Sequence, residues 1–388
     1  MKLLVANNAA PFVRGGAELL AERLVTELVA AGHEAELLRL PLGETSSEIA
    51  DGMVAAATLD VVNVDRVIAL KFPAYLIPHR DVVVWLIHQY RQVYDLAPAG
   101  GWEGHDELRA LADLVRGADA AALRRATRIH AISPEVAARL DRYNGISADG
   151  ILRGPPYADY AYRCETPEPY LVALGRISGG KRQALAARAM AHAGPTGRLI
   201  VAGPPDSPES LAELERAIDE AGVRDRVEVT ARFIDDDHKL DLLARCTGSV
   251  YLPVDEDTYG YVPYEAARSS KPTVVCTDSG GALTLVQDGV SGLVAEPTPE
   301  ALGAAFQSLL ADPAGAAITR PSSRAGTTSS CGVRRSRRGC ARRCRCATSR
   351  TPHPRWRESS PSSTSPCSRS ATAPGTRRSS GWPRPCRA

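Results

Sequence analysis

The sequence predicts an α/β fold of two Rossmann-like domains that face each other across a cleft. Up to about residue 312, short apolar runs alternate with amphipathic stretches of helical period. Buried strands joined by helices in this way indicate parallel sheets covered on both faces. A proline-rich break, RGPPYADYAYRCETPEP, interrupts the alternation, which starts afresh after it. We therefore expect an N-terminal domain over residues 1–155 and a C-terminal domain over residues 156–318.

Each domain is predicted from its own series of elements. Before the break we expect strands at residues 2–6, 34–40, 66–70, 81–87 and 128–133, with helices at 17–31 and 134–143. After it we expect strands at 170–175, 198–203, 226–231, 248–253, 272–277 and 292–296, with helices at 207–221 and 299–310. Ligands of such sheets bind at the carboxyl ends of the strands, so the residues that follow these strands are the candidates for a site.

The composition is that of a globular protein with ordinary cores. The chain has 388 residues, of which 44% are hydrophobic and 24% charged. No apolar run approaches the roughly 18 to 20 residues of a membrane span, and the start MKLLVANNAAPF does not match a signal peptide. We therefore expect a cytoplasmic protein. Cys164, Cys246 and Cys276 stand in apolar surroundings and are expected to be reduced core residues.

Residues 319–388 differ sharply from the rest. They hold 17 arginines, one acidic residue and six of the nine cysteines, which leaves 30 basic and 44 acidic residues in 1–318. Such a segment cannot bury enough apolar surface to fold. A basic arm for nucleic acid or membrane and a cysteine-rich metal site are alternatives, but CRC lacks paired CxxC spacing. We favour a frameshift, because a GC-rich gene read out of frame encodes mainly Arg, Ser, Pro, Ala, Gly and Cys.

Two glycine pairs predict anion binding. Gly15 and Gly16 directly precede a helix, where the backbone can approach a ligand closely; a tight turn is the alternative. The absence of GxGxxG disfavours an NAD enzyme. In VALGRISGGKRQAL, Arg176 follows a strand and Lys181 opens the next helix. A guanidinium and an ammonium beside a helix start predict a diphosphate site, with solvated surface charges as the alternative.

Two carboxylates flank a glycine in DTYGYVPYEA. Asp257 is expected in a loop, whereas Glu265 is expected on a helix that begins near Tyr261 or Val262. We interpret them as contacts to different parts of one extended ligand rather than as a proton-transfer pair. His88 ends a strand of the first domain and is predicted to face the cleft, with a structural role as the alternative.

These motifs resemble those of retaining nucleotide-sugar glycosyltransferases of family 4, which have the GT-B fold. The resemblance covers about residues 1–313 and rests on VRGGAE, HQYRQVYDL, HAISPEVAARLDRYNG, LGRISGGKR and YLPVDEDTYGYVPYEAARSSKPTVVCTDSGG. It implies a metal-independent hexosyltransferase that uses a UDP- or GDP-sugar as substrate, with no other cofactor. The implied acceptor is a hydroxyl of a glycan, a lipid-linked or a small molecule, in surface-polysaccharide or secondary-metabolite biosynthesis. No nucleic-acid partner is implied, and a peripheral membrane contact is left open.

The family pattern also implies roles at the nucleotide end of the donor. Arg176 and Lys181 would hold the diphosphate, with Gly15 and Gly16 approaching it from the first domain. Glu265 would accept hydrogen bonds from the ribose. The nucleobase would lie beside the backbone of Arg232, Phe233 and Ile234.

At the sugar end, the resemblance assigns hydroxyl binding to Asp257, with nearby backbone amides from Gly260, Tyr261 and Val262. His88 would contact the sugar near the reacting carbon. The first acid is Asp where the family more often has Glu, so its side chain is one methylene shorter.

Two further departures stand against the resemblance. AGPPDS replaces a glycine-rich turn and leaves Gly203 without its usual glycine partner, and the family's closing helix has no counterpart in 319–388. A GT-B epimerase, a phosphorylase and a donor-binding but inactive chain are therefore kept as alternatives. Acceptor choice is assigned to first-domain loops such as residues 97–111.

Overall fold

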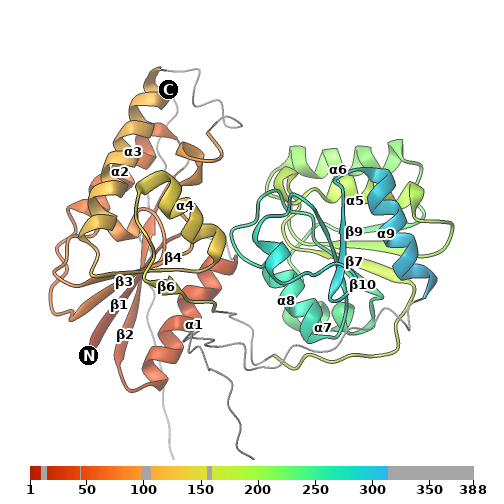
Figure 1. Ribbon diagram of the computed structural model, residues 1–388, viewed down its shortest axis with the longest axis horizontal. Helices are drawn as coiled ribbons and strands as arrows, with labels where there is room; N and C mark the ends of the chain where they lie inside the picture. Colours follow the sequence, from red (N-terminus) through yellow and green to blue (C-terminus); the bar gives the residue numbers. More distant parts are fainter. Residues whose placement is uncertain (10–14, 44, 98–105, 155–159, 313–388) are drawn as a thin grey trace, which may run out of the picture. The chain divides into compact units, whose positions relative to one another are not determined.

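The computed structural model describes residues 1–9, 15–43, 45–97, 106–154 and 160–312, which form two parallel six-stranded sheets with helices around them (Figure 1). Both sheets belong to the same compact unit of the chain, since residues of the two sheets are linked by contacts within it. The predicted α/β fold class is confirmed. The expected domain boundary at 155/156 and the segment 319–388 lie outside the described residues, so both stay predictions.

The first sheet has the strand order β2-β1-β3-β4-β5-β6. Its strands are β1 (Lys2–Ala9), β2 (Glu34–Pro41), β3 (Arg66–Ala69), β4 (Val82–Leu86), β5 (Arg128–Ala131) and β6 (Gly150–Ile151). The surrounding helices are α1 (Gly16–Ala30), α2 (Ser46–Ala57), α3 (Asp106–Arg125) and α4 (Pro134–Asn144), with short 3-10 turns η1 (Ala74–Leu76) and η2 (Arg91–Val93). The pattern did not indicate β6, whose two residues are too few to show a period.

One expectation for this half is wrong. Residues 97–111 do not form a continuous loop, because α3 begins at Asp106. The acidic pair Asp106 and Glu107 suits the positive end of the helix dipole, and the helix then continues to Arg125. The glycines that precede Asp106 hid this start.

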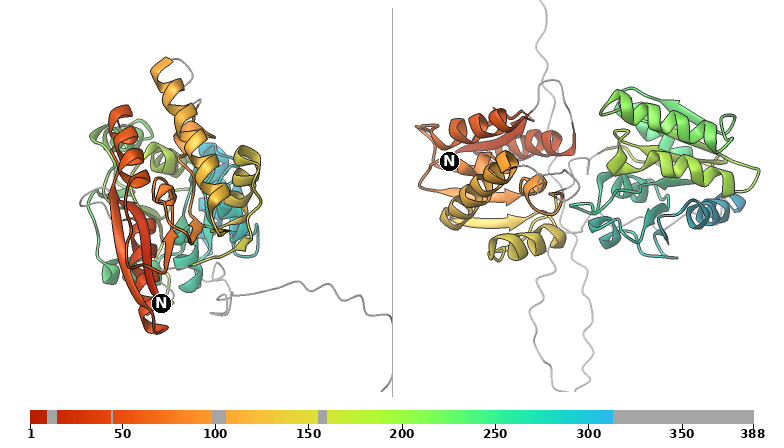
Figure 2. Two further views of the ribbon diagram at one scale, coloured as in Figure 1. Left: turned by 90° about the vertical axis from the view of Figure 1, so that its left-hand side faces the viewer. Right: turned by 90° about the horizontal axis from the view of Figure 1, so that it is seen from above.

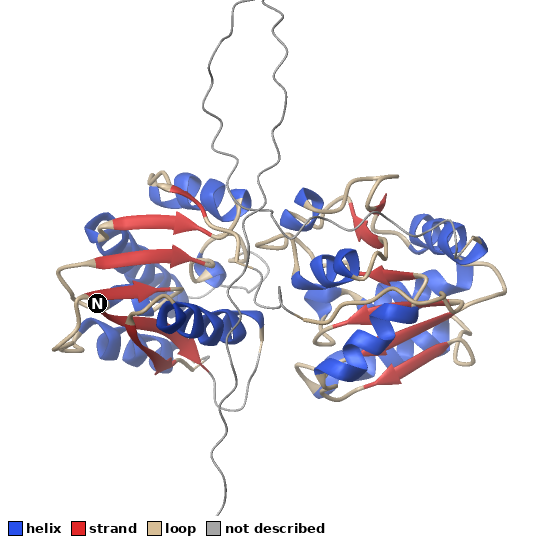
Figure 3. Ribbon diagram, turned by 90° about the horizontal axis from the view of Figure 1, so that it is seen from below, coloured by secondary structure: helices blue, strands red, loops and turns tan. Residues whose placement is uncertain are grey.

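The second sheet has the order β12-β11-β10-β7-β8-β9. Its strands are β7 (Tyr170–Leu174), β8 (Arg198–Ala202), β9 (Val227–Thr230), β10 (Gly248–Val250), β11 (Thr273–Cys276) and β12 (Gly292–Ala295). Its helices are α5 (Gln183–Ala189), α6 (Pro208–Glu220), α7 (Asp236–Arg245), α8 (Tyr261–Arg268) and α9 (Pro299–Ala311), with 3-10 turns η3 (Gly179–Lys181), η4 (Met190–His192) and η5 (Gly281–Thr284). Strands and helices of each half can be followed in Figure 3.

Three local expectations for the second half need correction. Lys181 ends the turn η3 and precedes α5 rather than opening it. The sequence TDSGGALTLV also predicts a glycine-rich loop at Gly280 and Gly281 that leads into a helix, but the structure has only the short turn η5 there. Cys246 and Cys276 are buried and free, but Cys164 is exposed, because it lies in the proline-rich connection outside any strand or helix.

Alternate residues of β7 serve the two faces of the second sheet. Leu171 and Ala173 belong to an apolar cluster that includes side chains of α5, α6 and α9, whereas Val172 and Leu174 pack with side chains of α7 and α8. All five residues of β7 are buried. A parallel strand covered on both faces reads as a continuous apolar run, which is why YLVAL has no polar alternation.

Local sequence sets where several helices begin. Ser133 accepts a hydrogen bond from the Val136 amide at the start of α4, and Asp235 does the same for the His238 amide at the start of α7. Proline occupies the first turn of α4, α6 and α9, where its missing N–H costs nothing. The acidic residues Asp236 and Asp237 occupy the first turn of α7, where they suit the positive end of the helix dipole.

The strand order creates a switch point in the second sheet. From β7 the chain proceeds to β8 and β9 on one side, and β10 then pairs with β7 on the other. Ligands of open α/β sheets bind beside the carboxyl ends of two such strands. Two further views show the strands and helices of each half (Figure 2). Among the described helices, none is both long and apolar enough to cross a bilayer.

Candidate active site

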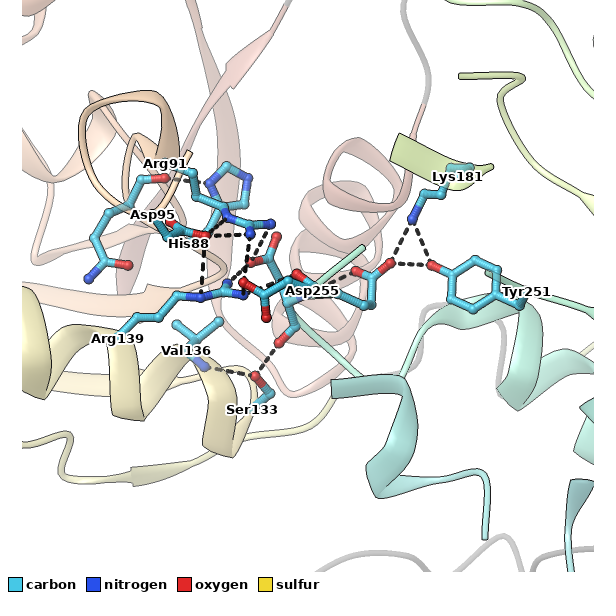
Figure 4. A network of polar contacts seen from close by, with 12 residues as sticks. His88, Arg91, Asp95, Ser133, Val136, Arg139, Lys181, Tyr251 and Asp255 are labelled. Carbon is cyan, nitrogen blue, oxygen red and sulfur yellow. Dashed lines mark hydrogen bonds and ion pairs between the residues drawn. The ribbon is translucent and has the colours of Figure 1, made fainter. Parts of the chain in front are cut away.

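Lys181 reaches from the segment after β7 to the segment after β10. Its Nζ lies 2.6 Å from Oε2 of Glu256 and 2.8 Å from the hydroxyl of Tyr251 (Figure 4). Ser178 helps to position Lys181, since the Ser178 hydroxyl accepts a hydrogen bond from the Lys181 amide. The two loops that leave the switch point are thus joined by a cation and a carboxylate.

Glu256 keeps its charge although it is nearly buried. Burial alone would raise the pKa of Glu256, but the adjacent Lys181 outweighs it and holds the pKa below its ordinary value. Burial and the Glu256 charge raise the pKa of Tyr251 well above the usual range, so that its hydroxyl stays protonated and donates to Oε2. Lys181 is therefore neutralised by a carboxylate that our sequence analysis assigned no role.

Arg176 is placed differently from Lys181. Its side chain is exposed and makes no hydrogen bond or ion pair with a described residue. Its charge nevertheless contributes to the pKa of Lys71, which burial lowers despite the opposing effect of Glu18. The structure therefore leaves the Arg176 guanidinium available to a ligand.

The loop that carries the first acid is supported from behind by the segment after β11. The Asp255 amide donates to the Asp278 carbonyl at 2.9 Å, and the Gly281 amide donates to the Glu256 carbonyl at 2.8 Å. Gly280 has φ +56°, and a Cβ there would lie 2.6 Å from the Glu256 nitrogen. Glycine is required at this close approach, which explains part of the motif TDSGG.

Asp257 is ion-paired through one of its two oxygens. Its Oδ1 contacts Nη1 of Arg139 and lies 3.2 Å from Nη1 of Arg91, both from the first half of the chain. Its Oδ2 makes no hydrogen bond or ion pair with any described residue. The Ser133 hydroxyl also donates to the Asp257 carbonyl, so the backbone is held as well.

Arg91 and Arg139 belong to a larger charge cluster. Arg91 Nε donates to Asp95 Oδ2 at 2.8 Å, and Arg139 Nη2 lies 2.8 Å from Asp255 Oδ2 (Figure 4). With Asp257, three carboxylates surround two guanidiniums. In the part of the chain that the structure describes, no group of three or more His, Cys, Asp or Glu side chains could hold a metal ion.

His88 lies at the end of β4 as a neutral imidazole. Its Nδ1 is 2.6 Å from the Gln89 carbonyl, and since a carbonyl only accepts, Nδ1 carries the proton. Burial lowers the pKa of His88, although the nearby Asp257 charge acts in the opposite direction. The remaining nitrogen, Nε2, can therefore accept a hydrogen bond from a ligand hydroxyl.

A buried polar chain anchors this segment in the core. Gln89 Nε2 donates to Asn144 Oδ1 at 3.0 Å, and Asn144 Nδ2 lies 3.3 Å from the Tyr94 hydroxyl. Tyr94 and Tyr75 each donate to Asp119, at 2.9 Å to its two oxygens. Burial raises the pKa of Asp119 to about 7. Sequence analysis missed this chain, because its members come from four separate segments.

Glu265 lies on α8 with its side chain almost fully buried. Its Oε1 is 2.9 Å from Nζ of Lys239, which is also 3.0 Å from Asp236 Oδ1. Burial raises the pKa of Glu265, and Lys239 offsets only part of this effect. Burial would lower the pKa of Lys239, but pairing with Glu265 outweighs it and raises the pKa.

The N-terminal glycines meet the second half of the chain at one point. The Gly15 amide donates to Glu18 Oε2 at 2.9 Å, which caps α1. A Cβ on Gly16 would lie 2.3 Å from Cε2 of Tyr261. Gly16 is therefore needed where the aromatic ring at the start of α8 approaches the start of α1.

The start of α8 has another glycine requirement. Gly260 has φ +74°, and a Cβ there would lie 2.5 Å from Cε1 of Tyr251. Its amide already donates to the Thr258 hydroxyl at 3.0 Å, so this group is engaged within the protein. Val262 is partly buried and packs into the apolar clusters beneath the helix.

The segment expected beside the nucleobase follows β9. Phe233 is an exposed aromatic side chain, 66% accessible, and Arg232 is also exposed. Ile234 packs against the cluster that includes residues of α7. No described residue makes a hydrogen bond or ion pair with the side chain of Arg232, and the roles of Arg232 and Phe233 stay predictions.

Several residues of the site have no role in the sequence analysis: Arg91, Asp95, Arg139, Lys239, Tyr251 and Glu256. Two observations could have found some of them. HQYRQVYDL and HAISPEVAARLDRYNG each carry one of the arginines, and the acid between the two aspartates of DED is Glu256.

Comparison with known proteins points to one family. Residues 162–325 match the family model described as "Glycosyl transferases group 1". This match covers less than half of the chain. The chain is 33% identical over 105 residues to alpha-1,3/1,6-mannosyltransferase ALG2 of Dictyostelium discoideum, covering 27% of this chain and 24% of the relative. It is 32% identical over 120 residues to ALG2 of Homo sapiens, covering 30% and 28%. The matches thus span about a quarter of these curated relatives.

Several solved structures share the architecture at low sequence identity. Sucrose-phosphate synthase from Thermosynechococcus elongatus superposes with a TM-score of 0.65 at 18% identity, covering 81% of this chain and 91% of that one. WaaG, a glycosyltransferase involved in lipopolysaccharide biosynthesis, gives 0.60 at 18% identity, covering 80% and 90%. HepE of Anabaena in complex with UDP and glucose gives 0.57 at 18% identity, covering 82% and 96%. The two-sheet architecture is therefore the GT-B fold.

Proposed function

We propose that this protein is a retaining, metal-independent glycosyltransferase that moves a sugar from a nucleoside diphosphate sugar to a hydroxyl acceptor. The observation that carries the proposal is the junction at the switch point of the second sheet. There Nζ of Lys181, a cation of the kind that binds diphosphates, lies 2.6 Å from Oε2 of Glu256, the residue that precedes Asp257. The glycosyltransferase group 1 match over this half supports the same conclusion.

The diphosphate would be held by Lys181 and Arg176. The Lys181 side chain is 34% exposed, so a phosphate oxygen can reach its Nζ and replace the Glu256 carboxylate. Arg176 is not engaged by a described residue and can add a second charge-assisted contact. Both cations would stabilise the negative charge that develops on the leaving diphosphate.

The sugar and the ribose would be held by oxygens and a nitrogen that make no hydrogen bond or ion pair with a described residue. Oδ2 of Asp257 and Nε2 of His88 are both acceptors, as binding of sugar hydroxyls requires. Glu265 uses Oε1 for Lys239 and retains Oε2 for the ribose. Since each acid is paired with a different cation, we assign neither of them a proton-transfer role.

We infer a front-face displacement as the reaction. The bond between the anomeric carbon and the diphosphate oxygen breaks while the acceptor oxygen forms its bond on the same face. The acceptor proton passes to the departing diphosphate oxygen, so no protein base is required. The charge on the diphosphate is where Lys181 and Arg176 act most strongly.

The comparisons also bear on the donor and the pathway. Similarity to the mannosyltransferase ALG2 supports a mannosyl donor. Because HepE, which has a similar fold, was solved in complex with UDP, we also propose UDP-sugars as candidate donors. The similar fold of WaaG, a glycosyltransferase involved in lipopolysaccharide biosynthesis, is consistent with a role in surface-polysaccharide assembly. We place the protein in the cytoplasm, where nucleotide sugars are its substrates, with a glycan, lipid-linked or small-molecule acceptor.

The proposal is tested with the purified full chain. UDP, GDP, UDP-glucose and GDP-mannose are titrated by calorimetry, and each nucleotide sugar is then followed for hydrolysis and for transfer to glycoside acceptors. We expect one nucleotide to bind and its sugar to be released slowly with retained anomeric configuration, as read by NMR. Inverted configuration would contradict the retaining mechanism. Binding without turnover would instead favour the donor-binding inactive chain, and conversion of the bound sugar would favour an epimerase.

A further inference from the structure

We infer that Arg139 is a positioning residue for the donor sugar: it holds Asp257 by one carboxylate oxygen and leaves the other free to bind a sugar hydroxyl. This inference rests on the proposed function and assigns the first half of the chain a part in donor recognition. It concerns a residue that the sequence analysis did not single out.

The contacts of Arg139 are directed at the acid loop. Its side chain is 7% exposed, and Nη1 contacts Asp257 Oδ1. Nη2 donates to the Asp255 carbonyl at 3.0 Å and lies 2.8 Å from the Asp255 carboxylate. The guanidinium thus contacts the side chains of two residues and a backbone carbonyl of the same loop, and its fixed planar arrangement of donors matches them better than the compact ammonium of a lysine would.

The start of α4 adds a second point of attachment. The Ser133 hydroxyl accepts from the Val136 amide at 3.1 Å and donates to the Asp257 carbonyl. Ser133 therefore fixes the Asp257 backbone, whereas Arg139, six residues further along the same helix, fixes its carboxylate. Two contacts from one rigid helix determine both the position and the rotation of this side chain.

The geometry favours positioning over a merely structural ion pair. Arg139 and Arg91 contact only Oδ1 of Asp257. These contacts orient the carboxylate, and Oδ2 remains able to accept a hydrogen bond from a ligand. Aspartate is one methylene shorter than glutamate, and its reach is set by the backbone and by this orientation. The carboxylate is 17% exposed, and its Oδ2 makes no hydrogen bond or ion pair with a described residue, so a sugar hydroxyl can reach it.

The test compares Arg139→Gln and Arg139→Lys with Arg142→Gln, an exposed arginine on the same helix. The measured quantity is the gain in affinity of the nucleotide sugar over the bare nucleoside diphosphate, obtained by calorimetry, together with kcat and KM. We expect Arg139→Gln to reduce this gain and kcat by about 10- to 100-fold, because a charge-assisted contact is lost. UDP or GDP affinity should stay within about twofold, and Arg142→Gln should match wild type.

A double-mutant cycle with Asp257→Asn decides whether Arg139 acts through Asp257. If it does, Arg139→Gln should cost less than about twofold in the Asp257→Asn background. An equal cost in both backgrounds, or a parallel loss of UDP or GDP affinity, would overturn the inference. If Arg139→Gln does not fold by circular dichroism, Arg139→Lys takes its place in the cycle, with an expected loss of about 3- to 30-fold.

The binding readout separates this inference from the proposed function. Wild-type chain that binds a nucleotide sugar more tightly than the nucleotide but never transfers the sugar would contradict the proposed reaction, while the Arg139 comparison could still be made. Wild-type chain that shows no such gain in affinity would overturn the inference itself.

Discussion

Nζ of Lys181 lies 2.6 Å from Oε2 of Glu256, so the lysine expected to bind a diphosphate is neutralised inside the protein by the residue next to Asp257. This contact joins the segments after β7 and β10 at the switch point of the second sheet. A bound donor must therefore compete with Glu256 for the cation, and two predictions follow from that competition.

Replacing Lys181 should affect turnover more than donor binding. We expect Lys181→Ala to lower kcat by roughly 100- to 1000-fold, since one charge-stabilising donor contributes about 2.7–4 kcal/mol to the transition state. Single-turnover measurements with saturating donor check this. Lys2→Ala, which alters a lysine of β1, serves as the control and should behave as wild type. Unchanged turnover in Lys181→Ala would exclude the assigned role.

Replacing Glu256 should have the opposite effect on nucleotide affinity. Glu256→Gln removes the carboxylate that competes for Lys181 but keeps an oxygen for the Asp257 amide, which donates to Oε1 at 3.1 Å. We expect UDP or GDP to bind several-fold more tightly, with a steeper dependence on salt, because the lysine charge is no longer compensated. Weaker nucleotide binding at every salt concentration would show that Lys181 does not meet the diphosphate.

Lys239 should stabilise the fold by compensating the buried Glu265. Breaking a buried ion pair by removing one partner typically costs about 3–5 kcal/mol, and we expect Lys239→Met to approach the lower value. Burial raises the pKa of Glu265, and without Lys239 its carboxylate would be left uncompensated at pH values high enough to ionise it. The loss of stability should therefore be larger at pH 8 than at pH 5.

Thermal unfolding of Lys239→Met across this pH range checks the expectation. The double variant Lys239→Met with Glu265→Gln is the control, because it removes the uncompensated charge and should recover most of the lost stability. A double variant as unstable as the single one would point to packing rather than charge.

Asp119 should make stability depend on pH in an unusual direction. Its pKa is raised to about 7 from the ordinary value of 3.8, so the folded protein holds a proton that the unfolded chain releases. Between these values, unfolding releases this proton, and stability falls as pH rises; above about pH 7 the effect is complete. The total contribution is at most about 4 kcal/mol.

Asp119→Asn removes the titrating group and isolates its effect. We expect the difference in Tm between variant and wild type to shift in favour of the variant from pH 5 to pH 7 and to level off by pH 8. Asp113→Asn, an exposed aspartate on the same helix, should show no such trend. A difference in Tm independent of pH would mean that Asp119 is ionised in the folded protein throughout.

Much of the fold could be predicted because its determinants are local. The run YLVAL is buried over its whole length, and Ser133 and Asp235 each cap the helix that they begin. These features depend on neighbours within a few residues. The start of α3 and the strand β6 were missed because a glycine-rich stretch hides the former and the latter is too short for a period.

The site was predictable only in part, for a related reason. Strand ends place Lys181, Asp257 and Glu265 at the carboxyl edge of the second sheet, and sequence spacing suffices for that. Their partners come from distant positions: Arg139 is separated from Asp257 by 118 residues along the chain. No spacing rule connects such residues, because their meeting depends on how whole sheets and helices pack.

By itself, the sequence determined the two series of strands and helices, the parallel sheets that they form and the acids and cations placed at the strand ends. Hydrophobic periodicity and capping act over a few residues, so these outcomes are written locally. Only the tertiary structure decided which charges are already compensated: Lys181 by Glu256, Glu265 by Lys239, and one oxygen of Asp257 by Arg139. Ion pairing in a partly buried site depends on distances of a few ångströms between remote segments, and only the packed chain sets those distances.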